Sequence, residues 1–108
     1  MTAGAGPDPV RAELAGRIVA IGAAIGRRPV SRGELAREID AIRVIAGRAG
    51  LFPAVAVAHL LDDALSRGEG GALVGACLAV LSDAVASDRN DAAACDTFAA
   101  ACAVRFVG

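Results

Sequence analysis

The residues best suited to chemistry lie around the single histidine of the chain, His59. Asp62, Asp63 and Ser66 follow it at spacings of three, four and seven, so all four share one face of a helix. An exposed imidazole beside two carboxylates is more basic than usual. Such a group can accept a proton or a phosphoryl group, or bind a metal ion. The alternative interpretation is a surface histidine in a weak local ion pair.

The sequence AHLL at residues 58–61, on an exposed helical face of a small bundle, resembles the phospho-acceptor helix of histidine phosphotransfer domains. The resemblance implies that His59 exchanges a phosphoryl group with response-regulator partners, without a metal ion bound by this chain. It covers about eight of the 108 residues. The family usually has a lysine three positions after the histidine and then a glycine, where this chain has Asp62 and Asp63. Two carboxylates repel an incoming phosphoryl group.

A metal site at His59, Asp62 and Asp63 needs a fourth ligand, usually from a second helix. The sequence lacks the paired Glu-x-x-His motifs that bind two iron ions in helical bundles. A symmetric dimer would bring two such clusters together. For the single chain we predict no metal site and no cofactor.

Four arginines lie where the first predicted helix ends and the second begins, and they form a possible patch for an anion or a protein partner. They are Arg27, Arg28, Arg32 and Arg37. The segment VSRGELAREI, residues 30–39, is similar to the first helix of a helix-turn-helix, which makes a nucleic-acid-binding regulator a further alternative. The turn and recognition helix of that motif do not follow, because the apolar period continues to residue 49. The absence of lysine, together with a net charge of −1, makes nucleic acid the less favoured partner.

Other catalytic motifs are missing from the sequence. It contains no Walker loop or G-x-G-x-x-G, and the glycine-rich residues 68–71 lack the preceding strand that a dinucleotide site requires. The serines have no histidine and acid at a recognisable spacing. We therefore predict that the chain is not an enzyme.

The three cysteines, Cys77, Cys95 and Cys102, lack CxxC spacing and lie in apolar helical segments. We interpret all three as buried thiols rather than as redox or metal-binding groups.

Apolar residues recur every three or four positions along the chain, which predicts five helices joined by short turns. These helices position the residues described above. Asp8 caps the first helix and Pro9 occupies its first position. Ser31 and Glu34 predict a capping box at the start of the second. The predicted helices cover residues 9–26, 31–50, 52–66, 71–87 and 92–108.

The sequence predicts an all-α fold, a single-domain antiparallel helical bundle of about five helices over residues 9–108, after a disordered or frayed tail over residues 1–8. Alanine accounts for 27 of the 108 residues, and it is the best helix former. The β-branched and aromatic runs that mark strands are missing. The helix over residues 71–87 is nearly apolar all round, which is typical of a central helix.

Small residues recur at every fourth position on the first and fourth predicted helices, which lets another backbone approach closely. The two lines are Ala12, Gly16, Ala20 and Ala24, and Gly71, Gly75 and Ala79. We predict that these two helices make the closest contact, within one chain or across a dimer. Hydrophobic residues reach 56% even without the glycines, more than one small bundle can hide, which favours self-association.

Hydropathy and charge indicate where in the cell the protein is expected and what kind of partner suits it. The longest uncharged run, residues 70–82, is shorter than the roughly 18 residues of a membrane span. The first ten residues lack the pattern of a secretory signal, so we expect a cytoplasmic protein. Residues 1–54 carry a net charge of +3 and residues 55–108 one of −4, which suits head-to-tail contact or an oriented partner as well as an ordinary solvated surface.

The favoured function is therefore a small helical interaction or adaptor module that forms a homodimer or binds another protein. Phosphotransfer through His59 and nucleic-acid binding through the arginines at residues 27–37 are the alternatives.

Overall fold

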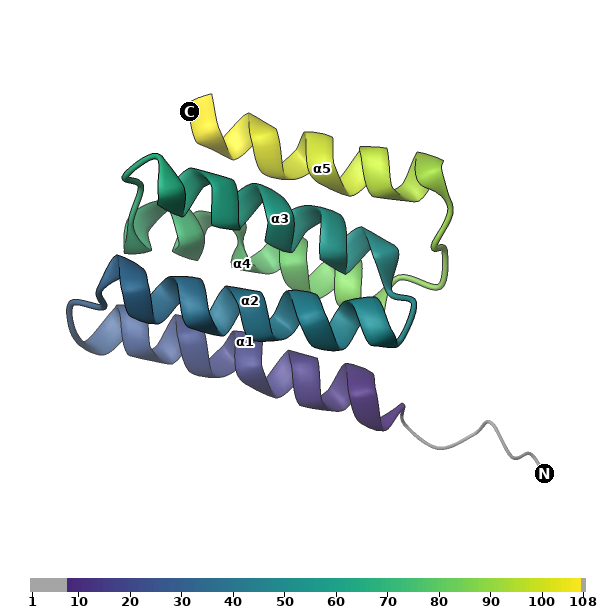
Figure 1. Cartoon of the computed structure of the whole chain (residues 1–108), viewed down its shortest axis with the longest axis horizontal. Helices are drawn as coiled ribbons and strands as arrows, with labels where there is room; N and C mark the ends of the chain where they lie inside the picture. Colours follow the sequence, from purple (N-terminus) through teal and green to yellow (C-terminus); the bar gives the residue numbers. More distant parts are fainter. Residues whose placement is uncertain (1–7, 108) are drawn as a thin grey trace.

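The computed structural model describes residues 8–107, which form five α-helices and no strand (Figure 1). The helices are α1 (Pro9–Arg27), α2 (Arg32–Arg48), α3 (Phe52–Ser66), α4 (Gly71–Ala86) and α5 (Ala92–Val107). The predicted all-α class and the number of helices are confirmed. Of the tail predicted over residues 1–8, only Asp8 lies within the described residues, and it belongs to α1 as its N-cap.

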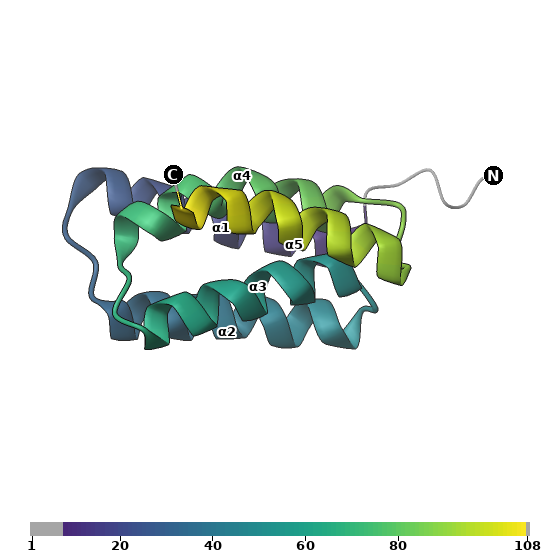
Figure 2. The same ribbon diagram turned by 90° about the horizontal axis from the view of Figure 1, so that it is seen from above.

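The first four helices form a closed ring, and the fifth packs outside it. α1 contacts α2 and α4, and α3 contacts the same two helices, whereas α5 contacts α3 and α4. Successive helices run in opposite directions (Figure 1). Figure 2 shows the result as two layers, α2 with α3 and α1 with α4 and α5. None of the helices within residues 8–107 has the length and apolar composition of a membrane span.

Local hydrogen bonds begin the first two helices largely as the sequence predicts. The Asp8 carboxylate accepts the backbone N–H of Val10 at 3.0 Å, and the Ser31 hydroxyl accepts that of Glu34 at 3.1 Å. The reciprocal half of the predicted capping box is wrong. The carboxylate of Glu34 accepts hydrogen bonds from Arg28 instead, because that guanidinium extends from the end of α1 across the turn.

Two glycines end α2 and α3 by the same device. Gly50 and Gly68 adopt φ angles of +74° and +102°, a region that favours glycine. The following residues then donate their N–H groups back to the helix, from Leu51 to the carbonyl of Ala46 at 2.9 Å and from Glu69 to the carbonyl five residues earlier at 3.1 Å. This is the Schellman motif, which satisfies carbonyls that a helix end otherwise leaves without partners.

The core is built from aliphatic and small side chains, and no polar or charged side chain is buried within residues 8–107. α4 contacts all four other helices, as expected of a central helix. Two of the three cysteines, Cys77 and Cys102, are buried as predicted, but Cys95 is only half-buried, so that part of the prediction is wrong. The largest fully buried hydrophobic side chains include Leu14, Leu35, Ile39, Ile42, Leu61 and Leu81.

The contact between α1 and α4 uses small residues, although not all of the predicted ones. Gly71 and Gly75 of α4 make room for Ile25, whose side-chain carbons lie 3.7 and 3.9 Å from where a Cβ would stand on each glycine. On α1, Gly22 faces Leu78 in the same way at 3.4 Å. The predicted line on α1 does not make this contact, because Ala12, Gly16 and Ala20 are exposed.

The Schellman turn after α2 gives a prediction about stability. Replacing Gly50 by alanine is expected to lower the free energy of unfolding by about 1–2 kcal/mol, because a residue with a Cβ is strained at positive φ. The matched control is Gly47→Ala, three residues earlier, where the glycine is helical and exposed and the new Cβ makes ordinary contact with Val55 at 3.9 Å. That change is expected to stabilise by up to about 1 kcal/mol. Urea denaturation followed by circular dichroism measures both, and equal effects of the two variants would contradict the prediction.

Candidate functional site

His59 lies on the outer surface of α3, in the layer that α3 forms with α2. Its side chain is 68% exposed, and its Nε2 lies 3.7 Å from a carboxylate oxygen of Asp63, one turn later on the same helix. The exposure of His59 and its pairing with Asp63 agree with their spacing of four residues in the sequence. The imidazole is accessible to a reagent or partner in solution.

Asp62 does not complete a cluster with His59. Its carboxylate turns toward α2, where an oxygen lies 3.6 Å from Nε of Arg43, and that arginine also pairs with Asp40 of its own helix. The two neighbouring carboxylates therefore serve different partners, Asp63 the histidine and Asp62 the arginine. Within the described residues no three histidine, cysteine or acidic side chains come together in a way that could bind a metal ion.

The surroundings of Asp62 also set its protonation. Burial against α2 raises the pKa of Asp62, and the nearby charge of Asp40 raises it further, while Arg43 and His59 oppose the shift. The side chain is 25% exposed, the least among the charged groups paired on this face. Folding therefore disfavours the ionised form of Asp62.

A groove between α2 and α3 brings together residues that the sequence assigned to different sites. Its volume is about 420 Å³. It joins Arg32 of the predicted arginine patch to Asp62 and Ser66, and His59 is not among the residues that line it. The hydroxyl of Ser66 donates a hydrogen bond to the carbonyl of Asp62 at 3.0 Å, so it serves the helix rather than the imidazole. The lining residues are Arg32, Gly33, Ala36, Asp40, Asp62, Leu65 and Ser66.

The four arginines of the predicted patch are divided among different partners. Arg28 donates to both oxygens of Glu34, at 2.8 and 3.3 Å, and this hydrogen bonding lowers the pKa of the Glu34 carboxyl. Arg32 donates to the backbone carbonyl of Gly68 at 2.9 Å, which ties the start of α2 to the end of α3. Arg27 and Arg37 are exposed. Because Arg28 and Arg32 already bind groups of this chain, they are less available to the phosphate groups of a nucleic acid. Nucleic-acid binding stays a prediction.

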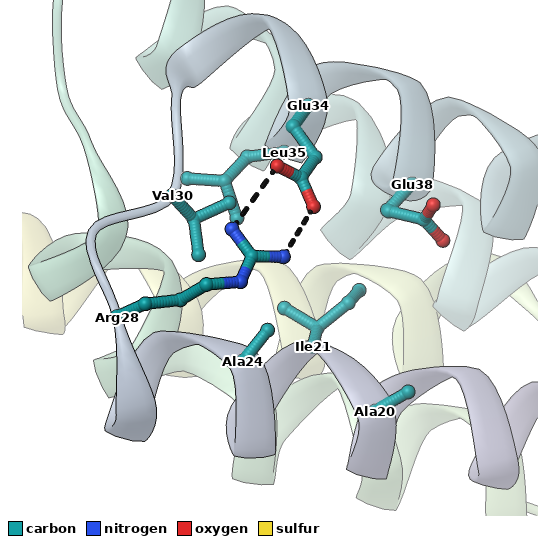
Figure 3. Close-up of a pocket in the computed structure, with 8 residues that line it drawn as sticks. All are labelled: Ala20, Ile21, Ala24, Arg28, Val30, Glu34, Leu35 and Glu38. Carbon is teal, nitrogen blue, oxygen red and sulfur yellow. Dashed lines mark hydrogen bonds and ion pairs between the residues drawn. The ribbon is translucent and has the colours of Figure 1, made fainter.

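Sequence reasoning missed a pocket between α1 and α2 over which the Arg28–Glu34 pair lies (Figure 3). Alanines and branched aliphatic side chains form its walls, and Glu38 lies farther along α2. Its volume is about 230 Å³, below the roughly 300–1,000 Å³ of typical ligand sites. The lining residues are Ala20, Ile21, Ala24, Arg28, Val30, Glu34, Leu35 and Glu38.

The two layers of the molecule differ sharply in the charge of their exposed residues. Five of the eight exposed residues of α2 are charged, but only one of the seven on α4 and two of the ten on α1. The layer that contains α4 therefore presents a surface of alanine, glycine and isolated larger apolar side chains. The exposed residues of α4 are Ala72, Gly75, Ala76, Ala79, Ser82, Asp83 and Ala86.

This weakly charged surface, which we call the alanine face, is the exposed side of α1, α4 and α5. α4 lies between the other two helices and contacts both (Figure 2). Val19 of α1 and Val104 of α5 stand out from it, with 70% and 66% of their surface exposed. Alanine and glycine side chains let a helix of another molecule approach closely. The exposed residues of the face therefore offer mainly small apolar groups for contact.

Comparison of the chain with protein-family models, with curated proteins and with solved structures finds no match. The features that bear on function are therefore the surface around His59 and the alanine face.

The raised pKa of Asp62 predicts a dependence of stability on pH. Asp62→Asn is expected to increase the free energy of unfolding near pH 7, by less than about 1 kcal/mol. With the pKa higher in the folded chain, the stability contributed by Asp62 is complete below its unfolded pKa and falls as pH rises through the folded value. The asparagine variant lacks that loss, so its advantage should vanish at about pH 2.5, where the wild-type carboxyl is neutral. Urea denaturation at both pH values measures the difference.

Asp91 supplies a control, because its pKa is lowered in the folded chain whereas that of Asp62 is raised. It accepts the backbone N–H of Ala94 at 2.9 Å and pairs with Arg89, and both interactions lower its pKa. Its contribution to stability is present above the unfolded pKa and is lost as pH falls through the folded value. Asp91→Ala should therefore destabilise at pH 7 and have less effect in acid. A loss of stability on Asp62→Asn at pH 7 would contradict the interpretation of Asp62.

Proposed function

We propose that this chain is a small helical interaction module that associates with a second copy of itself through the alanine face. The observation that carries the proposal is the low charge of the exposed residues on α1 and α4, against the charged surface of α2. Exposed apolar surfaces of several hundred Å² usually mark protein interfaces. Such a face in contact with water alone is unfavourable, and a partner removes it from water.

Two features favour a second copy as the partner. A two-fold axis makes a surface self-complementary, so a face of small residues can pack on the same face of another chain. The charges also suit this arrangement, because α1 carries a net charge of +2 and α4 one of −1. A two-fold axis that places α1 of one copy against α4 of the other brings these opposite charges together.

The exposed side of α1 is suited to close packing against another helix. Ala15, Gly16 and Ala23 surround Val19 on the exposed side of α1. A Cβ built on Gly16 would meet no atom within 4 Å, so this position leaves room for a neighbouring backbone. On α1, Val19 supplies a large apolar side chain that such a neighbour would cover, and large anchors of this kind dominate the binding energy of interfaces.

The test compares two valines of opposite layers. Val19→Glu introduces a charge into the alanine face, and Val44→Glu introduces the same charge on α2 in the charged layer. We expect the wild-type chain to show twice its monomer mass of 10.7 kDa by light scattering. Val19→Glu should weaken the dimer by at least about tenfold, because a desolvated, unpaired charge costs more than about 1.4 kcal/mol. Val44→Glu should leave the dimer intact.

Two outcomes would contradict the proposal. A wild-type chain that stays monomeric at high concentration would remove the need for a self-partner. A Val19→Glu variant that dimerises as the wild type does would place the interface elsewhere. Circular dichroism of both variants checks that the helices are retained, and since Val19 is exposed, its replacement leaves the core unchanged.

Phosphotransfer through His59 is the second candidate function, and the exposure of the imidazole favours it. His59 is 68% exposed on a helix of the four-helix ring, where a receiver domain could reach it. The carboxylate of Asp63, with an oxygen 3.7 Å away, can orient the ring but also repels an incoming phosphoryl group.

A phosphorylation assay separates this function from self-association. The chain is incubated with a phosphodonor and an active receiver domain, and acid-labile phosphate is measured on the wild type and on His59→Ala. Phosphotransfer predicts a phosphohistidine that disappears in the variant. No acid-labile phosphate on the wild type would sink this candidate. Because His59 lies in the opposite layer from the alanine face, His59→Ala should not change the mass in solution.

A further inference from the structure

Two cysteines meet where α5 packs on the ring. Cys77 of α4 and Cys102 of α5 are both fully buried, and their sulfur atoms lie 3.4 Å apart. The thiol of Cys77 also lies 3.9 Å from the backbone carbonyl oxygen of Cys102. No polar or charged side chain is buried within residues 8–107, so this thiol pair is the only reactive group in the described core. Its position between two helices distinguishes it from an isolated buried cysteine.

The two sulfur atoms are placed for bond formation. A disulfide has an S–S distance of about 2.05 Å, so the atoms need to approach by a little more than 1 Å. Small rotations of two side chains supply such a shift. We propose that Cys77 and Cys102 are a redox-active dithiol that forms a reversible disulfide and clamps α5 onto α4. It revises the sequence-based interpretation of Cys77 and Cys102 as buried thiols without a redox role, because their spacing in the sequence does not show that the two sulfur atoms meet. This site goes beyond the interaction function proposed above and does not depend on it.

The reaction needs an oxidant, and a small-molecule disulfide such as oxidised glutathione supplies it. One protein thiolate attacks the glutathione disulfide, forms a mixed disulfide and releases one glutathione thiolate. The second protein thiolate then attacks the protein sulfur of the mixed disulfide and releases the second glutathione. Two protein thiols lose two electrons and two protons in total, and one glutathione disulfide becomes two glutathione thiols. Excess reduced glutathione reverses both steps.

Burial controls when this exchange occurs. Burial, with the adjacent Cys77 thiol, raises the pKa of Cys102 to about 12, so this thiol stays protonated in the folded chain. A thiol is a poor nucleophile compared with its thiolate. The dithiol therefore reacts when α5 moves away from α4. This motion leaves the ring of α1 to α4 in place, because α5 contacts only α3 and α4.

The experiment uses the full chain with Cys95→Ala, which removes the half-buried third thiol and leaves the pair alone. This protein is equilibrated with mixtures of oxidised and reduced glutathione. By denaturing mass spectrometry we expect a single chain two mass units lighter, with no disulfide between chains, and peptide mapping that links residues 77 and 102. The closed loop spans 25 residues, so the melting temperature should rise by at least about 5 °C on oxidation and return on reduction.

The matched control is the double variant Cys77→Ala, Cys95→Ala, which should form no intramolecular disulfide and show no rise in melting temperature. If that variant does not fold, the comparison of oxidised with reduced Cys95→Ala decides the question, because both forms have one sequence. The proposal is overturned if no intramolecular link forms in excess oxidised glutathione, even at a temperature where the helices begin to unfold. It is equally overturned if the link forms and lowers the melting temperature.

Discussion

Burial of small and aliphatic side chains is the only interaction that holds the helices together through their core. Within residues 8–107 no polar or charged side chain is buried, so no network of polar side chains inside the core fixes how the helices meet. The fit of shapes must do so, as where Ile25 lies against two glycines of α4. The helices gain most of their stability from this packing, since short helices are marginal in isolation. Side-chain caps then fix the starts of α1 and α2, and backbone hydrogen bonds around Gly50 and Gly68 end α2 and α3.

This constraint places the charges of the described residues on the outside, where the two layers differ. The arginines of α2 and of the turn before it pair with groups on their own helix and on neighbouring ones, with Glu34, with Asp40 and Asp62, and with a backbone carbonyl. Exposed pairs of this kind contribute little to stability. The opposite layer carries few charges, and most of its exposed side chains on α1 and α4 are small. The two layers thus differ in surface charge as well as in the helices that build them.

Much of the fold was predictable from the sequence because its signals are local. Asp8 with Pro9 and the Ser31 cap act on their own turns, and the sequence predicts both. The errors concern contacts between helices. The carboxylate of Glu34 binds Arg28 rather than its own cap, Asp62 turns to Arg43, and three of the four small residues in the predicted line on α1 face outward. Spacing shows which residues share a face, but only packing decides which helix lies opposite that face.

The place of α5 outside the ring has a consequence for partly folded chains. The helices α1 to α4 enclose most of the core by themselves. In a chain whose α5 has not docked, the surface of α3 and α4 that α5 covers is exposed. Such a chain presents a second apolar surface beside the alanine face, including the thiol of Cys77. Docking of α5 closes this surface, which is the one most prone to misassociation between partly folded chains.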